Sequence, residues 1–260
     1  MRTLINILLV LLLAVMVENC FGKNNLNTEI EVSYLSRYIW RGQEGTDDPV
    51  IQPSLTTTYE NLKLNIWGNI DTTGTNNNEG DFSELDYTVE YWDKFPGINR
   101  INYSLGMIYY DFPCTNFEDT TELFWGIDID IPLKPFIRIY HDLDEVKGGI
   151  YKSIGLGHSI NNIFKIGRET RAGIQQNYWS ADLNLNASLG WGNKTYNRSY
   201  WEVKKQGLND FVFSIALPIE NRGITLIPNI TFINLIDSKI RNTRNGNDFT
   251  VFGITICKKF

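Results

Sequence analysis

The chain has 260 residues, a formal net charge of −6 and 42% hydrophobic residues, which suits one large domain or two small ones and excludes a disordered chain. Its basic residues form no cluster, so the electrostatic pattern of a nucleic-acid-binding protein is missing. Its three cysteines are too few for a disulfide scaffold, and we expect Cys114 and Cys257 to be small apolar residues without a special role.

The N-terminus predicts export. Arg2 precedes an apolar run at residues 4–17, which is shorter than the roughly 20 residues of a membrane-spanning helix and fits a secretory signal peptide. We therefore expect residues 1–22 to be a signal peptide and residues 23–260 to form a single domain. A lipoprotein anchored at Cys20 is an alternative, but the preceding Val-Glu-Asn lacks the small side chain usual beside a lipidated cysteine.

The first strand-like run of the mature chain is SYLSRYIWRGQEG. At a period of two, one face carries Tyr34, Tyr38 and Trp40, and the other carries Arg37 and Arg41. The run alone does not say which face is wet. If the chain forms a membrane barrel, the aromatic face should contact lipid and the two arginines should point into the lumen.

The rest of the chain repeats runs of about ten to fourteen residues in which apolar and polar side chains alternate. In the run 84–91, for example, apolar residues at odd positions oppose Glu84, Asp86 and Glu90. A β-sandwich and a membrane barrel could each accommodate this pattern. Sandwich strands cluster near five or six residues, whereas a tilted membrane strand needs roughly 9 to 11, so the length favours a barrel.

The connections between the runs alternate in length, which is typical of membrane barrels. Longer polar connections fall at residues 43–49, 72–81, 113–119, 144–148, 192–206 and 236–247, and tighter joins fall at residues 60–61, 93–99, 132–134 and 220–223. Residues 163–175 could form a thirteenth strand, but an odd number would put the 192–206 loop on the short-turn side. We therefore assign residues 161–179 to an extended periplasmic connection. The predicted fold is all-β, a closed antiparallel transmembrane β-barrel of about 12 strands with short periplasmic turns and longer extracellular loops.

Several motifs support this fold by resemblance. SRYIWRGQ, LNLNASLGWGN, GLNDFVFSIALPI and the final strand FTVFGITICKKF together resemble a conserved family of bacterial outer-membrane β-barrels of unknown function, whose first strand carries an aromatic-Arg-Gly motif. Phe260 resembles the terminal aromatic residue that the barrel-assembly machinery recognises, although Lys258 stands where that signature usually has a hydrophobic or aromatic residue. The resemblance implies the fold and an outer-membrane location, and the family has no established activity to carry over.

Charged side chains concentrate on the polar face of the runs, and we expect them to line the lumen. The candidates are Arg37, Arg41, Lys63, Glu84, Asp86, Glu90, Arg100, Glu122, Asp128, Asp130, Arg138 and Asp142. They could select solutes by charge in an open channel, or pair across strands and fill the lumen. Side chains can fill the interior of a barrel of about eight strands, whereas a porin of about sixteen strands keeps an open channel. A barrel of about twelve strands lies between these sizes, so both interpretations stand.

Two turns predict strand registers. The three-residue turn that begins at Pro132 places Asp128 opposite Arg138, an oppositely charged pair that would support a filled lumen. A two-residue turn places Thr58 opposite Lys63.

The sequence offers little for catalysis. His141 and His158 cannot form a relay with the acid or serine that follows each of them, because adjacent strand residues point to opposite faces. Asp128 and Asp130 share a face, but acidic pairs are common without catalysis. No metal-ligand spacing or nucleotide motif stands out, so we expect no enzyme, no metal and no cofactor.

The sequence thus predicts an outer-membrane barrel that acts as a small-solute channel or as a structural envelope protein. Its expected partners are outer-membrane lipid, the barrel-assembly machinery through Phe260, and small solutes. An alternative is an adhesion or binding scaffold whose 192–206 loop presents Tyr196, Tyr200 and Trp201. A barrel hydrolase and a soluble exported β-sandwich are further alternatives.

Overall fold

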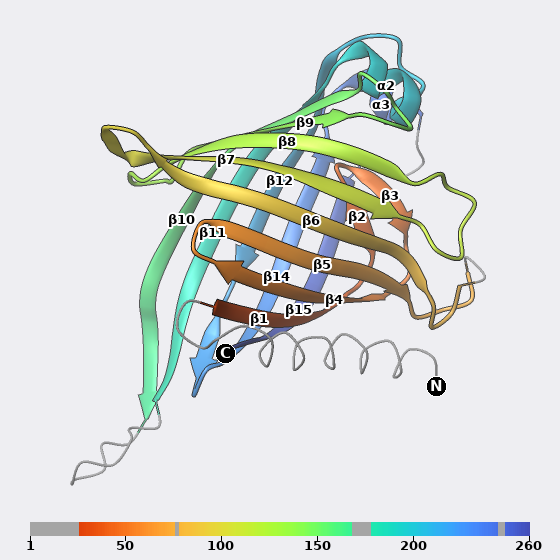
Figure 1. The fold of residues 1–260 in the computed structure, drawn as a ribbon. Helices are drawn as coiled ribbons and strands as arrows, with labels where there is room; N and C mark the ends of the chain where they lie inside the picture. Colours follow the sequence, from red (N-terminus) through yellow and green to blue (C-terminus); the bar gives the residue numbers. More distant parts are fainter. Residues whose placement is uncertain (1–25, 76–77, 168–177, 244–247) are drawn as a thin grey trace, which may run out of the picture.

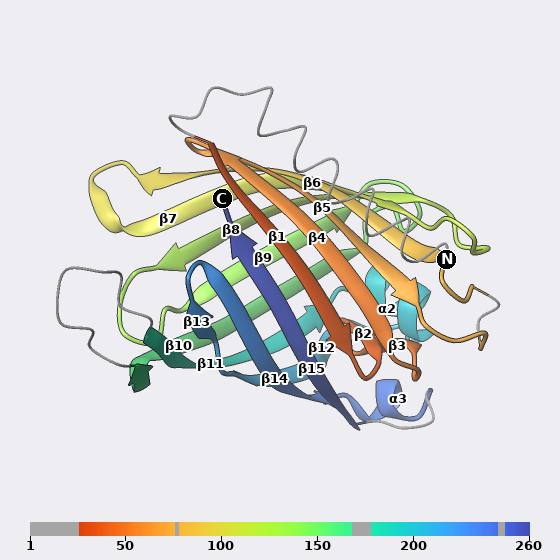
Figure 2. The same cartoon turned by 90° about the horizontal axis from the view of Figure 1, so that it is seen from below.

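The computed structural model describes residues 26–260 except 76–77, 168–177 and 244–247. Its strands form one closed antiparallel barrel (Figures 1 and 2), in the order β10-β9-β8-β7-β6-β5-β4-β1-β15-β14-β12-β11, which closes by pairing of β10 with β11. The strands of the wall are β1 (Leu26–Leu35), β4 (Val50–Tyr59), β5 (Leu62–Asp71), β6 (Phe82–Phe95), β7 (Ile98–Asp111), β8 (Thr120–Ile129), β9 (Phe136–Asp142), β10 (Ile150–Gly167), β11 (Tyr178–Gly192), β12 (Gly207–Ala216), β13 (Ile219–Asn221), β14 (Ile224–Leu235) and β15 (Asp248–Lys259).

The barrel has 12 strand positions, as predicted. The short β13 pairs with both β11 and β14, so it continues the position of β12 after an interruption at Leu217 and Pro218. The predicted fold is therefore confirmed. The predicted signal peptide, residues 1–22, lies outside the described residues, as does Cys20.

The alternation of side chains explains the two surfaces of the wall. On β6, Tyr87, Val89 and Tyr91 are exposed on the outside, whereas Glu84 and Glu90 are buried toward the lumen. The same outward rows of exposed apolar side chains recur on the other strands, for example at Leu105 of β7. A sandwich would bury these rows between two sheets, and a barrel that crosses a membrane leaves them for hydrocarbon. None of the helices in the described part of the chain combines the length and apolar character of a membrane span.

The connections separate by length, as predicted. One end of the barrel, here called the long-loop end, carries the described residues of the connections 36–49, 72–75, 78–81, 112–119, 143–149, 193–206 and 236–243. The tight joins lie at the opposite, short-turn end. Helices α2 (Lys194–Trp201) and α3 (Ser238–Arg241) both lie at the long-loop end (Figure 1).

The connection predicted over residues 161–179 was wrong at both of its ends. Strand β10 runs to Gly167 and pairs with β11 as far as Tyr178, so residues 161–167 and 178–179 belong to two long strands. The prediction failed because it was decided on the number of strands: residues 161–167 lengthen β10 and residues 178–179 begin β11, so they add no thirteenth strand. A register shift lies between Ile160 and Phe164. Residues 168–177 lie outside the described part of the chain.

Of the two predicted registers, one is confirmed. Thr58 lies opposite Lys63. Asp128, however, lies opposite Phe136, and the predicted pairing with Arg138 was wrong by two residues because the connection spans residues 130–135. Since a two-residue shift preserves the face, Arg138 still reaches Asp128 diagonally, with 2.7 Å between Nη2 and Oδ2.

The largest correction concerns the first predicted strand. The wall strand β1 ends at Leu35, and the chain then folds inward as a separate hairpin of β2 (Tyr38–Trp40) and β3 (Gln43–Thr46). Tyr34 is exposed on the outside as expected, but Tyr38 and Trp40 do not contact lipid. Arg41 and Gly42 form the turn with φ of 47° and 80°, the positive values that a two-residue type I′ hairpin requires.

Candidate functional site: a lumen narrowed by an inward hairpin

Arg41, at the tip of the β2–β3 hairpin, binds the opposite wall. Its guanidinium donates two hydrogen bonds to the carboxylate of Glu122 on β8, at 2.7 and 2.6 Å, and the two side chains are only 9% and 3% exposed. A buried charge pair of this kind holds only when its geometry is good and its remaining hydrogen bonds are satisfied. The Tyr110 hydroxyl supplies one of these by donating to Glu122 at 2.8 Å.

Aromatic rings enclose the same guanidinium. Its central carbon lies 4.4 Å from the ring centroid of Trp40, 4.3 Å from that of Tyr140 and 4.6 Å from that of Tyr151. Cation–π contacts in a desolvated site each contribute on the order of 1–2 kcal/mol. We call the set of Trp40, Tyr140, Tyr151 and Glu122 the arginine cage.

The hairpin tip also packs against the far side of the barrel. A Cβ built on Gly42 would lie 2.8 Å from Leu235 Cδ2 and 3.2 Å from Asp210 Cβ, so the backbone approaches β14 and β12 closely. Asp210 accepts a hydrogen bond from the Tyr151 hydroxyl, 3.1 Å from either carboxylate oxygen. The tip therefore bridges the lumen from β8 to β12 and β14.

Helix α2 covers this assembly from the long-loop end. Its Tyr196 and Trp201 are each 1% exposed, and Tyr200 packs on Trp40 with 5.5 Å between ring centroids. Burial raises the pKa of both tyrosines, so the phenols stay neutral. The 192–206 loop therefore buries Tyr196 and Trp201, two of the three aromatic residues that the adhesion interpretation placed at the surface.

Asn193 caps α2 and fixes it to the wall. Its Oδ1 accepts from the backbone N–H of Tyr196 at 2.8 Å and of Ile150 at 3.1 Å, and its Nδ2 donates to the Gly148 carbonyl at 2.9 Å. We expect Asn193→Ala to destabilise α2 by about 1–2 kcal/mol. Faster amide hydrogen exchange within α2 would show this, and Thr195→Ala, at an exposed position, should leave exchange unchanged. Equal exchange in both variants would contradict the capping role.

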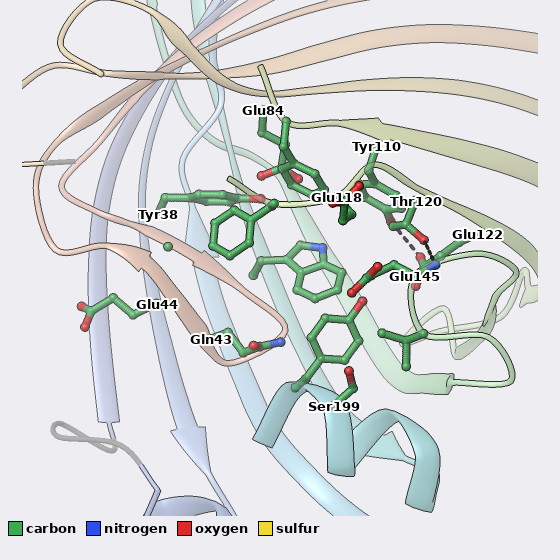
Figure 3. Close-up of a pocket in the computed structure, with 16 residues that line it drawn as sticks. Tyr38, Gln43, Glu44, Glu84, Tyr110, Glu118, Thr120, Glu122, Glu145 and Ser199 are labelled. Atoms are coloured by element: carbon green, nitrogen blue, oxygen red, sulfur yellow. Dashed lines mark hydrogen bonds between the residues drawn. The ribbon is translucent and has the colours of Figure 1, made fainter. Parts of the chain in front are cut away.

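Two adjoining cavities open beside the hairpin at the long-loop end. The outer cavity, of about 430 Å³, is shown in Figure 3, and a neighbouring cavity has about 500 Å³. Both are lined by Tyr38, Glu84, Phe112 and Phe117. The aromatic residues of the outer cavity are Tyr38, Trp40, Tyr110, Phe112, Phe117 and Tyr200, and its acidic residues are Glu44, Glu84, Glu118, Glu122 and Glu145.

The half of the lumen near the short-turn end carries charge pairs instead. Lys63 forms an ion pair with Glu90, and Arg138 forms one with Asp128. Lys63, Glu90 and Asp128 also line a third cavity of about 320 Å³. Space therefore remains at both ends of the lumen, separated by the hairpin.

The structure distributes the remaining predicted lumen residues over four places. Arg37 lies before β2 and binds Glu44 at 2.8 Å. Asp142 is buried and accepts from the Thr120 hydroxyl at 3.1 Å. Asp86 lies near Glu84 on β6, whereas Arg100 and Asp130 are exposed at the short-turn rim.

Sequence reasoning missed most of the arginine cage. Tyr140, Tyr151 and Asp210 lie on the inward phase of their strands, and that phase was the available signal. The residues predicted to line the lumen were all charged and none lay beyond Asp142, whereas tyrosines and a later aspartate build the site.

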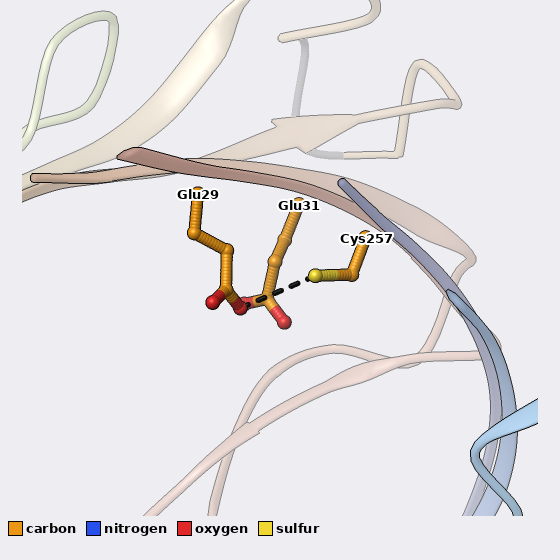
Figure 4. A group of neighbouring side chains, drawn as sticks. All are labelled: Glu29, Glu31 and Cys257. Atoms are coloured by element: carbon orange, nitrogen blue, oxygen red, sulfur yellow. Dashed lines mark hydrogen bonds between the residues drawn. The ribbon is translucent and has the colours of Figure 1, made fainter. Parts of the chain in front are cut away.

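A further group lies on the lumen face near the short-turn end (Figure 4). The ligand atoms of Glu29, Glu31 and Cys257 all lie within 4.8 Å of one another, the only such group of three potential metal ligands in the described part of the chain. The Cys257 thiol donates to Glu29 at 3.2 Å, and the ammonium of Lys259 lies 3.4 Å from Glu29. The Lys259 ammonium therefore neutralises part of the negative charge of Glu29 and Glu31 that a bound metal ion would otherwise neutralise.

Both histidines of the chain are described, and both lie on the outward phase. His141 pairs with Leu123, and His158 pairs with Leu185, in rows of apolar side chains. The lumen therefore contains no imidazole to serve as a general base.

Comparisons with known proteins agree on the fold. No protein-family model matches the sequence, and a search of curated proteins finds no match. Among solved structures, the NanC porin aligns with a TM-score of 0.54 and 12% identity over 90% of this chain and 100% of its own. LpxR from Salmonella typhimurium aligns with a TM-score of 0.51 and 11% identity over 89% of this chain and 99% of its own. The fold is thus that of the 12-stranded outer-membrane β-barrels.

Proposed function

We propose that the chain is an outer-membrane channel for small solutes whose lumen is narrowed by the β2–β3 hairpin. The observation that carries the proposal is a polar lumen with unfilled space on either side of the hairpin: cavities of about 430 and 500 Å³ toward the long loops and 320 Å³ toward the short turns. In this proposal the long-loop end faces the cell exterior and the short-turn end faces the periplasm.

The hairpin acts as the constriction of the proposed channel. Its tip bridges the wall strands through Arg41 and Glu122, so an ion or a small polar molecule has to pass beside it. The rings of side chains that remain would select permeating solutes by charge and size. No catalytic step is assigned to the chain in this proposal, because neither histidine faces the lumen and Asp128 is paired with Arg138.

Planar-bilayer conductance tests the proposal. Because Leu35 pairs with Val50, a short Asn-Gly turn can join β1 to β4 in place of residues 36–49 without disturbing the wall. We expect small currents from the intact protein and several-fold larger currents from this hairpin-deleted variant. Arg222→Asn, an exposed change in a short turn, serves as the control with unaltered current.

The possible outcomes separate the functional interpretations. Bilayers that stay silent with both the intact and the hairpin-deleted protein would overturn the channel and favour a structural envelope protein. Equal currents from the two proteins would keep a channel but remove the hairpin as its constriction.

A further inference from the structure

We propose that the outer cavity binds small organic cations that carry an aromatic or apolar group. The inference rests on the proposed channel for its biological use, because such a ligand would be a solute that enters from the long-loop end. It adds the chemical class of that solute and the residues that recognise it.

The charge of the lining supports a cationic ligand. The described residues that line the outer cavity include five glutamates. They include no lysine, arginine or histidine. Arg41 neutralises Glu122 and Arg37 neutralises Glu44. Glu118 and Glu145 are exposed and have no ion pair with a described basic residue, so they carry the unneutralised negative charge of the lining, whereas Glu84 is buried beside Tyr38 and Asp86. Carboxylates around a partly enclosed space raise the local concentration of cations.

The walls support an aromatic cation in particular. Six aromatic side chains line the cavity. Phe117 at its rim is 75% exposed, so an apolar ring is accessible to a ligand at the entrance. A cavity of about 430 Å³ falls in the range that holds a small organic ligand. Figure 3 shows Tyr38, Tyr110 and Glu84 turned toward the same space.

The arginine cage supplies an independent observation from the same molecule. It holds the Arg41 guanidinium between aromatic faces and a carboxylate, and two of its members, Trp40 and Glu122, also line the outer cavity. The outer cavity repeats this combination of rings and carboxylates without a cation of its own chain among the described lining residues. Gln43 adds a buried Nε2 without a hydrogen-bond partner in the described structure, a donor for an oxygen on the same ligand.

Calorimetric titration of the full-length protein in detergent tests the inference. The probe is 2-phenylethylammonium, and its matched controls are neutral 2-phenylethanol and anionic phenylacetate. We expect saturable binding of the ammonium compound that weakens as salt is added, at least tenfold weaker binding of the alcohol, and no binding of the carboxylate. Equal binding of ammonium and alcohol, or preferred binding of phenylacetate, would overturn the inference.

Variants assign the binding to the outer cavity. The double variant Glu118→Gln and Glu145→Gln changes two exposed residues and should weaken binding of the probe about tenfold. Phe117→Ala should weaken it severalfold through loss of ring contact. Glu202→Gln removes one glutamate charge from an exposed position at the same end that does not line the cavity, and it should leave binding unchanged, whereas Glu118→Gln alone should weaken it severalfold. Equal weakening by Glu202→Gln would mean a diffuse charge effect and would contradict the site.

Binding and conductance can fail separately. Saturable binding by a protein that carries no current would uphold the site and overturn the channel. Current without preferential binding of the ammonium probe would uphold the channel and overturn the site.

Discussion

Arg41→Ala is expected to release the β2–β3 hairpin from the lumen. The substitution leaves the Glu122 carboxylate buried without its cation, and breaking a buried pair in this way costs about 3–5 kcal/mol. An isolated two-stranded hairpin is marginally stable at best, so the hairpin should swing out into water while the barrel wall stays closed. We expect the free energy of hairpin opening to fall by that amount.

Limited proteolysis measures this release. Chymotrypsin should cleave at Tyr38 and Trp40 about two to four orders of magnitude faster in Arg41→Ala than in the intact protein, provided that opening and closing are fast relative to cleavage. Arg222→Asn serves as the control, because Arg222 is exposed in a short turn at the other end. Far-ultraviolet circular dichroism should show the same β-sheet content in all three proteins. Unchanged cleavage in Arg41→Ala would show that the cage does not hold the hairpin.

A double-mutant cycle then isolates the ion pair. Removing both partners in Arg41→Ala with Glu122→Ala leaves no unpaired carboxylate, so the double variant should open more easily than the intact protein but less easily than the sum of the single effects implies. Additive effects would mean that the two side chains act independently, contrary to the bidentate contact.

Gly42→Ala should release the same hairpin for a different reason. An alanine at φ of 80° costs about 1 kcal/mol, and its Cβ would lie 2.8 Å from Leu235 Cδ2, an overpacking that typically costs another 1–3 kcal/mol. We expect cleavage at Tyr38 and Trp40 to increase between about 30-fold and several hundredfold.

Gly97 provides the matched control for this variant. It has φ of 79°, but a Cβ there would meet no atom within 4 Å. Gly97→Ala therefore carries the backbone strain without the steric contact, and it should leave hairpin cleavage unchanged. If Gly42→Ala also leaves cleavage unchanged, the close approach of the tip to β14 does not contribute to its placement.

The wall of the barrel could be predicted because lipid and lumen impose a simple period. Rows such as Tyr87, Val89 and Tyr91 must face one way when Glu84 and Glu90 face the other, and two-residue turns fix which strands meet. The register of β8 against β9 was missed because the connection spans residues 130–135 and not 132–134, which moves the centre of the turn toward the N-terminus. An error of two residues leaves each side chain on the same face of the sheet. It changes only which residues of the two strands lie opposite each other.

The interior could not be predicted from the same period. Residues 33–41 alternate as cleanly in an inward hairpin as in a wall strand, so the pattern gave no sign that β1 ends at Leu35. Gly42 was the available signal, because glycine adopts the positive φ of a tight turn, whereas nothing in the sequence indicates the positive φ of Arg41. The cage itself joins Arg41 to Tyr140 and Tyr151, contacts that depend on how the closed wall brings distant strands together.

The hydrogen-bonded seam between β1 and β15 has a consequence for the order of assembly. Because these strands pair with each other, the ring cannot shut until the last part of the chain has arrived, while the hairpin that follows β1 is made early. Its tip needs partners on β8, β12 and β14, which come together only in the closed ring. Arg41 should therefore enter its cage late in folding. This step should be slow because it depends on contacts between residues that are far apart along the chain.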